Sequence, residues 1–197
     1  MGLSLDRTAY QKTLNELLFN QKLEFGFPTG SSRVDMDAQT TDSDMMQISI
    51  GQGTTAVTPL QMNMVTCAIA NQGVLMKPYV TDYVMSSGGN KIKSYEPSEY
   101  TKMMTAEQAA IMSGLMADVV EEGTASRLKG LSYTAAGKTG SAEYGTVKGE
   151  SHAWFTGFAP VEDPQICVTI IIEGAGAGGD YAVPIAKRIF DAYFGIQ

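Results

Sequence analysis

The sequence predicts an α+β protein in which a small antiparallel sheet is flanked by helices. Three apolar segments in the C-terminal third have the length and composition of strands, and their short connections favour antiparallel pairing. Segments with helical periodicity and recognisable end signals precede and follow them. The chain has 197 residues, which is enough for one domain with its own core.

The N-terminal part is predicted to hold two helices separated by a long loop. Asp6 is a capping residue, and its helix is expected to run to about Lys22. One side of that helix is apolar, formed by Tyr10, Leu14, Leu17 and Leu18. Residues 26–44 are polar and rich in turn formers, so a loop is expected there. The second helix is expected to begin at Thr58-Pro59 and to end at Asn71-Gln72-Gly73.

A hairpin and a third helix are predicted in the middle of the chain. Residues 79–85 and 91–95 have strand composition and flank the turn sequence Ser86-Ser87-Gly88-Gly89-Asn90. Thr105 and Gln108 have the spacing of a capping box at the start of a helix. Its apolar residues are expected to face the core, namely Ile111, Met112, Leu115, Met116, Val119 and Val120.

The C-terminal third is predicted to form the sheet and a last helix. The three strands are expected over residues 134–143, 153–159 and 165–173, and the helix over about 182–194. Residues 174–179 are glycine-rich, as in a dinucleotide-binding loop. They lie too near the C-terminus for a complete βαβ unit, so a flexible strand-to-helix connection is expected.

Composition excludes several classes of function. The formal net charge is −7 and no Lys/Arg-rich run is present, which argues against nucleic-acid binding. No apolar run approaches the roughly 18 residues of a membrane span. His152 is the only histidine, so a histidine triad or multi-histidine metal site is excluded. Cys67 and Cys167 are interpreted as buried packing residues rather than a disulfide framework or metal site.

The strongest candidate site is Lys138-Thr139-Gly140 with Ser141, in the first of the three C-terminal strands. Lys138 offers a positive charge, Thr139 offers a hydroxyl, and Gly140 has no side chain to keep a ligand away from the strand. These residues suit a peptide paired along the strand edge, with its terminal carboxylate held by Lys138, Thr139 and Ser141. The Ser141 N–H is expected to be one donor of an oxyanion hole.

A bare Lys-Thr-Gly tripeptide is usually only the end of a strand, so its context decides. The context is a series of motifs in order: Ser49-Ile50-Gly51-Gln52-Gly53, Val57-Thr58-Pro59-Leu60-Gln61-Met62, Ala70-Asn71-Gln72-Gly73, Val119-Val120-Glu121-Glu122-Gly123-Thr124-Ala125, Lys138-Thr139-Gly140 and Ala153-Trp154-Phe155-Thr156-Gly157-Phe158-Ala159-Pro160. This series, which covers residues 48–197, resembles the transpeptidase domain of penicillin-binding proteins, especially the monofunctional class B enzymes that cross-link cell-wall peptides.

The resemblance implies a partial serine transpeptidase or β-lactamase-like fold, with residues 1–197 as the C-terminal portion of a single domain. It implies an acyl-enzyme reaction on peptidoglycan stem peptides, inhibition by β-lactams, and a catalytic role for Lys138. No metal or organic cofactor is implied. The parent protein is expected at the extracytoplasmic face of the bacterial membrane, anchored by an N-terminal helix outside this chain.

The chain departs from the family in its missing nucleophile. Ser126-Arg127-Leu128-Lys129 is the only Ser-x-x-Lys sequence, and no Ser-x-Asn occurs. Ser126 stands just after a helix stop, whereas the family's nucleophile lies far upstream of Lys-Thr-Gly, so a chance match is expected. The N-terminal part of the domain is therefore expected to hold the nucleophile. The chain alone is expected to be inactive, and its uncovered apolar surface to favour self-association.

Two other readings stay open at this stage. One is a hydrolase of the same fold, a D,D-carboxypeptidase or a β-lactamase, in which water rather than an amine resolves the acyl-enzyme. The other is a non-catalytic module that binds peptides without attacking them. A Ser-x-x-Lys and a Ser-x-Asn upstream in the native gene would exclude the non-catalytic reading.

Overall fold

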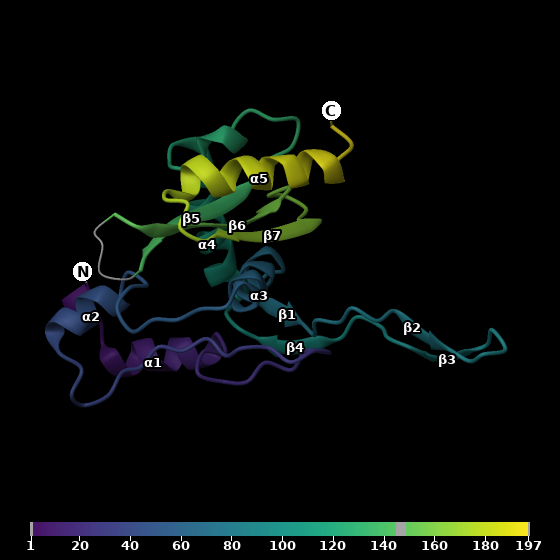
Figure 1. Ribbon diagram of the computed structural model, residues 1–197, viewed down its shortest axis with the longest axis horizontal. Helices are drawn as coiled ribbons and strands as arrows, with labels where there is room; N and C mark the ends of the chain where they lie inside the picture. The colour runs from purple at the N-terminus through teal and green to yellow at the C-terminus, as the bar shows by residue number, and fades with distance from the viewer. Residues whose placement is uncertain (1, 145–148, 197) are drawn as a thin grey trace.

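A computed structural model describes residues 2–144 and 149–196 and shows helices packed on both faces of a three-stranded sheet (Figure 1). The strands are β5 (Ala136–Glu143), β6 (Ser151–Ala159) and β7 (Ile166–Ile172). They are antiparallel, in the order β5-β6-β7. The predicted α+β class and the three predicted strands are therefore confirmed.

The central strand β6 alternates between the two faces of the sheet. Phe155 is fully buried against the helix α5 (Gly178–Tyr193), where Phe190 is also fully buried. Phe158 is fully buried in a separate cluster with Ile69 of α3 (Pro59–Ala70) and Met116 of α4 (Ala106–Glu121). Because successive side chains of a strand point to opposite faces, one strand supplies both cores.

Polar contacts join α3 to the sheet as well. Thr156 of β6 shares a hydroxyl–hydroxyl hydrogen bond of 2.6 Å with Thr66 of α3 and another of 2.7 Å with Thr169 of β7. Buried hydroxyls need partners, and each of these three has one. The packing of α3 beneath β6 and β7 is therefore fixed by hydrogen bonds in addition to apolar contacts.

The remaining elements form a second layer beneath α3 (Figure 1). It contains α1 (Arg7–Glu16), α2 (Asp42–Ile48), and a ribbon in which β1 (Val74–Met76) pairs with β4 (Glu99–Lys102). The hairpin of β2 (Tyr83–Met85) and β3 (Lys91–Ser94) projects from the body, and its position matches the prediction. The described residues also form two short 3-10 turns, η1 (Gly2–Ser4) and η2 (Ser126–Leu128).

Two N-terminal boundaries differ from those predicted. The helix α1 ends at Glu16 rather than near Lys22, because Leu18 and Asn20 adopt positive φ values of 64° and 61° that no helix can contain. The helix α2 begins at Asp42, inside the segment predicted as a loop, and Thr41 forms a full capping box with Asp44. That signal is present in the sequence, but the helix has only seven residues and little periodicity.

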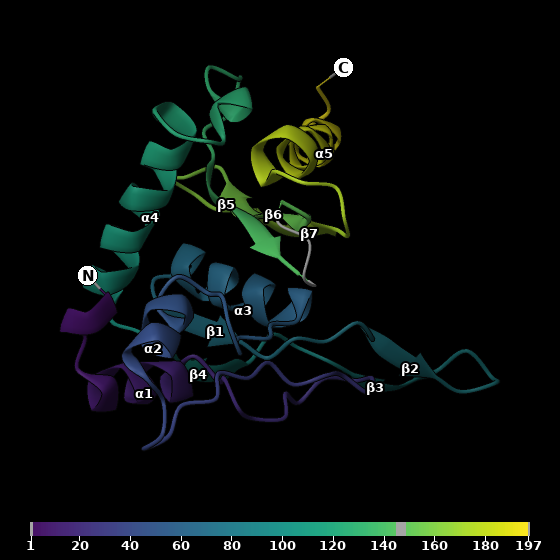
Figure 2. The ribbon, with the colours of Figure 1, turned by 60° about the vertical axis from the view of Figure 1, so that its left-hand side comes forward.

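The prediction that all six apolar residues of α4 face the core is wrong for three of them. Met116 and Val120 are buried, whereas Ile111, Met112 and Leu115 are 59%, 43% and 55% exposed. The helix packs against β5, α3 and η2 with its inner side and lies at the side of the molecule (Figure 2). We call the exposed side, formed by Ile111, Met112 and Leu115, the outer face of α4.

The last helix begins at Gly178, four residues earlier than predicted. Gly178 is buried, and a Cβ atom on it would lie 2.2 Å from the Trp154 carbonyl oxygen and 2.6 Å from that of Gly140. The start of α5 therefore rests directly on the backbone of β5 and β6. The absence of a side chain at Gly178 lets α5 lie close to the sheet backbone. The predicted flexible connection is therefore wrong for Gly178 and Gly179, which belong to α5.

We expect Gly178→Ala to lower the free energy of unfolding by roughly 1–3 kcal/mol, because the added methyl group meets backbone atoms that cannot move aside. Thermal unfolding followed by circular dichroism would measure the change. Gly114→Ala is the matched control, since a Cβ at that exposed position in α4 meets nothing within 4 Å. The control should be neutral or stabilising by up to about 1 kcal/mol, and an equal loss in both variants would contradict the assigned role of Gly178.

Candidate active site

Lys138, Thr139, Gly140 and Ser141 lie together on β5, the strand at one edge of the sheet. On its inner side β5 pairs with β6 along its whole length, and Gly140 is opposite Trp154. No strand among the described residues pairs with its outer side. An edge strand of this kind offers unpaired backbone groups to an extended ligand.

Two hydrogen bonds show which backbone groups point outward. The Thr139 carbonyl oxygen accepts from Lys138 Nζ at 2.7 Å, and the Ser141 carbonyl oxygen accepts from Gln52 Nε2 at 3.3 Å. The N–H and C=O of one residue point to the same side of an extended strand, and the side changes with each residue. The N–H groups of Thr139 and Ser141 therefore face the free edge of β5, where Gln52 also lies.

A cavity of about 310 Å³ opens beside these residues. Its sheet wall is formed by Lys138–Ala142 and Trp154–Thr156, and Ile50, Gly51 and Gln52 form part of the opposite wall. The rest of its lining is mostly apolar and comes from residues 10–57 and from α3: Tyr10, Leu14, Phe19, Val34, Ile48, Thr55, Val57 and Met62. An apolar cavity with a few convergent polar groups is the usual form of a ligand site.

The side chains of the four residues differ in their surroundings. Lys138 and Ser141 are exposed, and Thr139 is half-buried. The Thr139 hydroxyl shares a hydrogen bond of 2.5 Å with that of Thr124, in the loop that follows α4. Gly140 lies beneath the start of α5, so a bulky residue there would press on the Trp154 side chain, whose Cβ would be 3.2 Å away.

Gln52 and Thr124 contact the candidate site, yet reasoning from the sequence assigned no role to either. Each comes from a motif that carried the family resemblance, Ile50-Gly51-Gln52-Gly53 and Gly123-Thr124-Ala125. These two motifs were therefore the sequence signal that could have pointed to Gln52 and Thr124. The motifs do not show that Gln52 contacts Ser141, because the two residues are 89 positions apart in the chain.

We expect Gln52→Ala to loosen the free edge of β5, because the Ser141 carbonyl loses its side-chain donor. A hydrogen bond of this kind contributes about 1 kcal/mol, which corresponds to a roughly fivefold change in local opening. Amide hydrogen exchange over residues 138–142 would measure it. Gln39→Ala, a similar change on an exposed loop, should leave the exchange of these amides unchanged. Equal effects from both variants would contradict the role assigned to Gln52.

The Ser126-Arg127-Leu128-Lys129 sequence lies outside this cavity. Ser126 is exposed on the short turn η2. The Lys129 ammonium contacts Glu121, at 3.3 Å from its carboxylate and 2.9 Å from its carbonyl oxygen. A serine is activated by a base within hydrogen-bond reach, and Lys129 is engaged with Glu121 instead.

His152, Cys67 and Cys167, which were also considered from the sequence, lie outside the β5 cavity. The His152 ring stacks on that of Tyr144 with centroids 4.2 Å apart, and its Nδ1 accepts from the Gly174 N–H. Cys67 and Cys167 are half-buried rather than buried, and they line a different cavity. Within residues 2–144 and 149–196, no group of three His, Cys, Asp or Glu side chains is placed to hold a metal ion. The same residues include no helix long and apolar enough to cross a bilayer.

Comparison with known proteins decides the family. Residues 1–191 match the model of the penicillin binding protein transpeptidase domain. The chain belongs to this family. It is 34% identical over 151 residues to the peptidoglycan D,D-transpeptidase PbpA of Mycolicibacterium smegmatis, a match that covers 73% of this chain and 30% of the relative. It is 31% identical over 169 residues to the peptidoglycan D,D-transpeptidase MrdA of Haemophilus influenzae, covering 76% and 26%.

Solved structures of transpeptidase domains share the fold. The D,D-transpeptidase domain of a peptidoglycan glycosyltransferase from Eggerthella lenta superposes with a TM-score of 0.88 at 26% identity, covering 98% of this chain and 49% of that one. Penicillin-binding protein A from M. tuberculosis, solved as an imipenem acyl-enzyme complex, gives 0.84 at 25% identity, covering 95% and 42%. The chain therefore spans less than half of these solved chains and under a third of the two curated relatives.

Proposed function

We propose that this chain is the C-terminal portion of the transpeptidase domain of a peptidoglycan D,D-transpeptidase, and that the free edge of β5 holds the carboxylate end of a stem peptide. The observation that carries the proposal is the position of Lys138, Thr139 and Ser141 on an open strand edge beside a cavity. The names of the relatives support the reaction class.

In this proposal each residue of the edge has a separate task. The Lys138 ammonium makes the local field positive, which favours a terminal carboxylate. The hydroxyls of Thr139 and Ser141 donate hydrogen bonds to that carboxylate, and Thr124 holds the Thr139 hydroxyl in position. The Ser141 N–H, at the free edge, serves as one donor of the oxyanion hole. Gln52 holds the carbonyl group of the same residue from the opposite wall.

The reaction is acyl transfer from a D-alanyl-D-alanine peptide. A serine outside this chain attacks the carbonyl carbon between the two D-alanines, and the terminal D-alanine leaves with a proton as the acyl-enzyme forms. The amine of a second stem peptide then takes the acyl group and releases the serine. β-Lactams mimic the substrate, and the imipenem acyl-enzyme of the related M. tuberculosis protein supports that part of the proposal. The product is peptidoglycan, so the site is assigned to the extracytoplasmic face of the membrane.

The outer face of α4 supports the placement of further domain structure against this chain. Ile111, Met112 and Leu115 lie on one side of α4, and the described residues leave all three exposed. In the intact protein, the preceding part of the domain covers it. In the isolated chain, a second copy covers it, because exposed apolar patches associate.

We therefore expect the isolated chain to self-associate, and Leu115→Glu to raise the dissociation constant at least tenfold. Burial of a leucine contributes about 1.5–3 kcal/mol, which the charged side chain removes. Light scattering across a concentration series measures the mass. Ala110→Glu adds the same charge at an exposed position beside the outer face and should change the constant much less. A monomer at high concentration that binds no hydrophobic dye would contradict the expectation.

The proposed function is tested on the intact protein with labelled penicillin and with a donor and an acceptor stem peptide. Acylation followed by a cross-linked peptide product is expected. Acylation with only a shortened donor peptide would mean a D,D-carboxypeptidase, and rapid hydrolysis of the penicillin would mean a β-lactamase. Peptide binding without acylation would mean a non-catalytic module. Each of these last three outcomes would overturn the transpeptidase proposal.

A further inference from the structure

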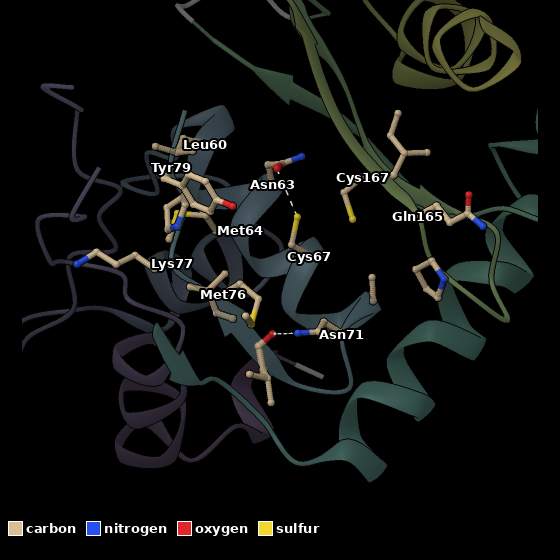
Figure 3. A pocket seen from close by; sticks show the side chains of 16 residues that line it. Leu60, Asn63, Met64, Cys67, Asn71, Met76, Lys77, Tyr79, Gln165 and Cys167 are labelled. Atoms are coloured by element: carbon tan, nitrogen blue, oxygen red, sulfur yellow. Dashed lines mark hydrogen bonds between the residues drawn. The ribbon is translucent and has the colours of Figure 1, made fainter. Parts of the chain in front are cut away.

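A second cavity, of about 590 Å³, plays no part in the proposed function. It lies between α3, the ribbon strand β1 and the start of β7, on the side of the sheet away from β5 (Figure 3). Cys67 of α3 and Cys167 of β7 both line it, 100 positions apart in the chain. Figure 3 shows both side chains directed into the space where the helix meets the strand.

The two thiols face each other at this seam (Figure 3). The Cys67 thiol donates to Asn63 Oδ1 at 3.5 Å. Asn63 in turn donates through Nδ2 to the Thr169 hydroxyl of β7 at 3.3 Å. Asn63 lies one turn before Cys67 on α3, so its contacts join α3 to β7 beside the sulfur atoms.

The surroundings make the two thiols unequal. A hydrogen bond from the Cys167 thiol stabilises the thiolate of Cys67 and lowers the pKa of Cys67, although burial opposes that shift. The same interaction raises the pKa of Cys167, and burial raises it further. The thiolate is the reactive form of cysteine, so Cys67 is the thiol that attacks first. Both residues are half-buried in the cavity wall, where a small reagent can reach them.

We propose that Cys67 and Cys167 are an oxidisable dithiol that closes to a disulfide between α3 and β7 by exchange with a small-molecule disulfide. The Cys67 thiolate attacks one sulfur of the reagent, whose other sulfur leaves as a thiolate and takes up a proton. Cys167 then loses its proton and attacks the Cys67 sulfur of the mixed disulfide, releasing the second reagent thiol. The protein loses two electrons and two protons, and the reagent is reduced to two thiols.

The disulfide would covalently link α3 to the face of the sheet on which α3 packs. It would close a loop of about 100 residues, the range in which disulfides restrict the unfolded chain most. It would tie α3 to β7, while β6 separates β7 from the Lys138 strand. The bond should therefore raise stability without altering the free edge of β5. Extracytoplasmic compartments favour such bonds.

The test uses the 197-residue chain, which has these two cysteines and no others. The reduced protein is incubated with oxidised glutathione, quenched with iodoacetamide, and analysed by intact-mass and peptide mass spectrometry. We expect a monomer that has lost two hydrogens, takes up no alkyl group, and contains a peptide pair joined through Cys67 and Cys167. The melting temperature should rise by about 10 °C, and reduction should reverse the rise.

Two variants and one condition separate the proposal from unspecific oxidation. Cys167→Ser should stop at the mixed disulfide of Cys67 with one glutathione, and Cys67→Ser should react more slowly. In concentrated urea, closure should slow several-fold, since the folded seam no longer holds the sulfurs together. Full alkylation of both thiols, glutathione on both cysteines without closure, disulfide-linked dimers, or equal closure rates with and without urea would each overturn the proposal.

Discussion

Intact-mass spectrometry of the 197-residue chain after incubation with benzylpenicillin should show only unmodified protein. Acyl transfer needs a nucleophile, a base that activates it, and two oxyanion-hole donors. The described site offers the Ser141 N–H and the charge of Lys138, and neither can form the acyl-enzyme. Binding without attack gives no covalent product, and we expect the remaining affinity to be millimolar or weaker, about −4 kcal/mol at best.

The intact protein is the positive control for this experiment and should become fully acylated under the same conditions. Ser126→Ala in the isolated chain should behave like the parent chain, because Ser126 is exposed on η2 and Lys129 contacts Glu121. A stoichiometric adduct on the isolated chain, mapped to Ser126, would show that the nucleophile lies within these residues. It would also overturn the proposal that the chain is a portion of a larger catalytic domain.

Lys138→Ala in the intact protein should slow acylation by a labelled penicillin at least tenfold while leaving the fold intact. The Lys138 ammonium is exposed at the free edge and, among the described residues, hydrogen-bonds only to the neighbouring Thr139 carbonyl. The Lys138 ammonium can therefore bind an incoming carboxylate without first breaking a buried ion pair. A charge-assisted contact contributes roughly 1.5–3 kcal/mol, which corresponds to a factor of about 10 to 150 in rate.

Lys129→Ala is the matched control for Lys138→Ala. It removes another exposed lysine, which lies outside the β5 cavity and whose ammonium contacts Glu121. Acylation should remain at the parental rate in this variant, and circular dichroism should show both variants folded. If the Lys138 variant reacted as fast as the parent and the Lys129 control, the role proposed for Lys138 would be wrong.

The rigidity of the β5 edge follows from how the sheet is packed. One face is covered by α5, which rests on β5 and β6 at Gly178, and the other by α3 and α4. Gln52 and Thr124 hold the edge from two further directions. A site that must meet developing charge benefits from such preorganisation, because its groups need not move during the reaction. The effects of Gly178→Ala and Gln52→Ala therefore bear on function as well as stability.

Local features were predictable because their causes lie within a few residues. The capping box at Thr105, the proline at the start of α3, and the three strands with short connections are each set by neighbouring side chains. The Lys138-Thr139-Gly140 site was located by its residue types and by the order of the surrounding motifs. The sequence by itself thus determined the fold class, the family and the four residues of the candidate site.

Only the tertiary structure decided which distant residues meet and which surfaces stay open. The contact of Gln52 with Ser141, the pairing of Cys67 with Cys167, and the close approach at Gly178 each join segments that are tens of residues apart. The outer face of α4 has the same periodicity as a buried face, so its exposure cannot be read from Ile111 or Leu115 themselves. Local periodicity shows that a side is apolar, but burial depends on which other elements pack against it.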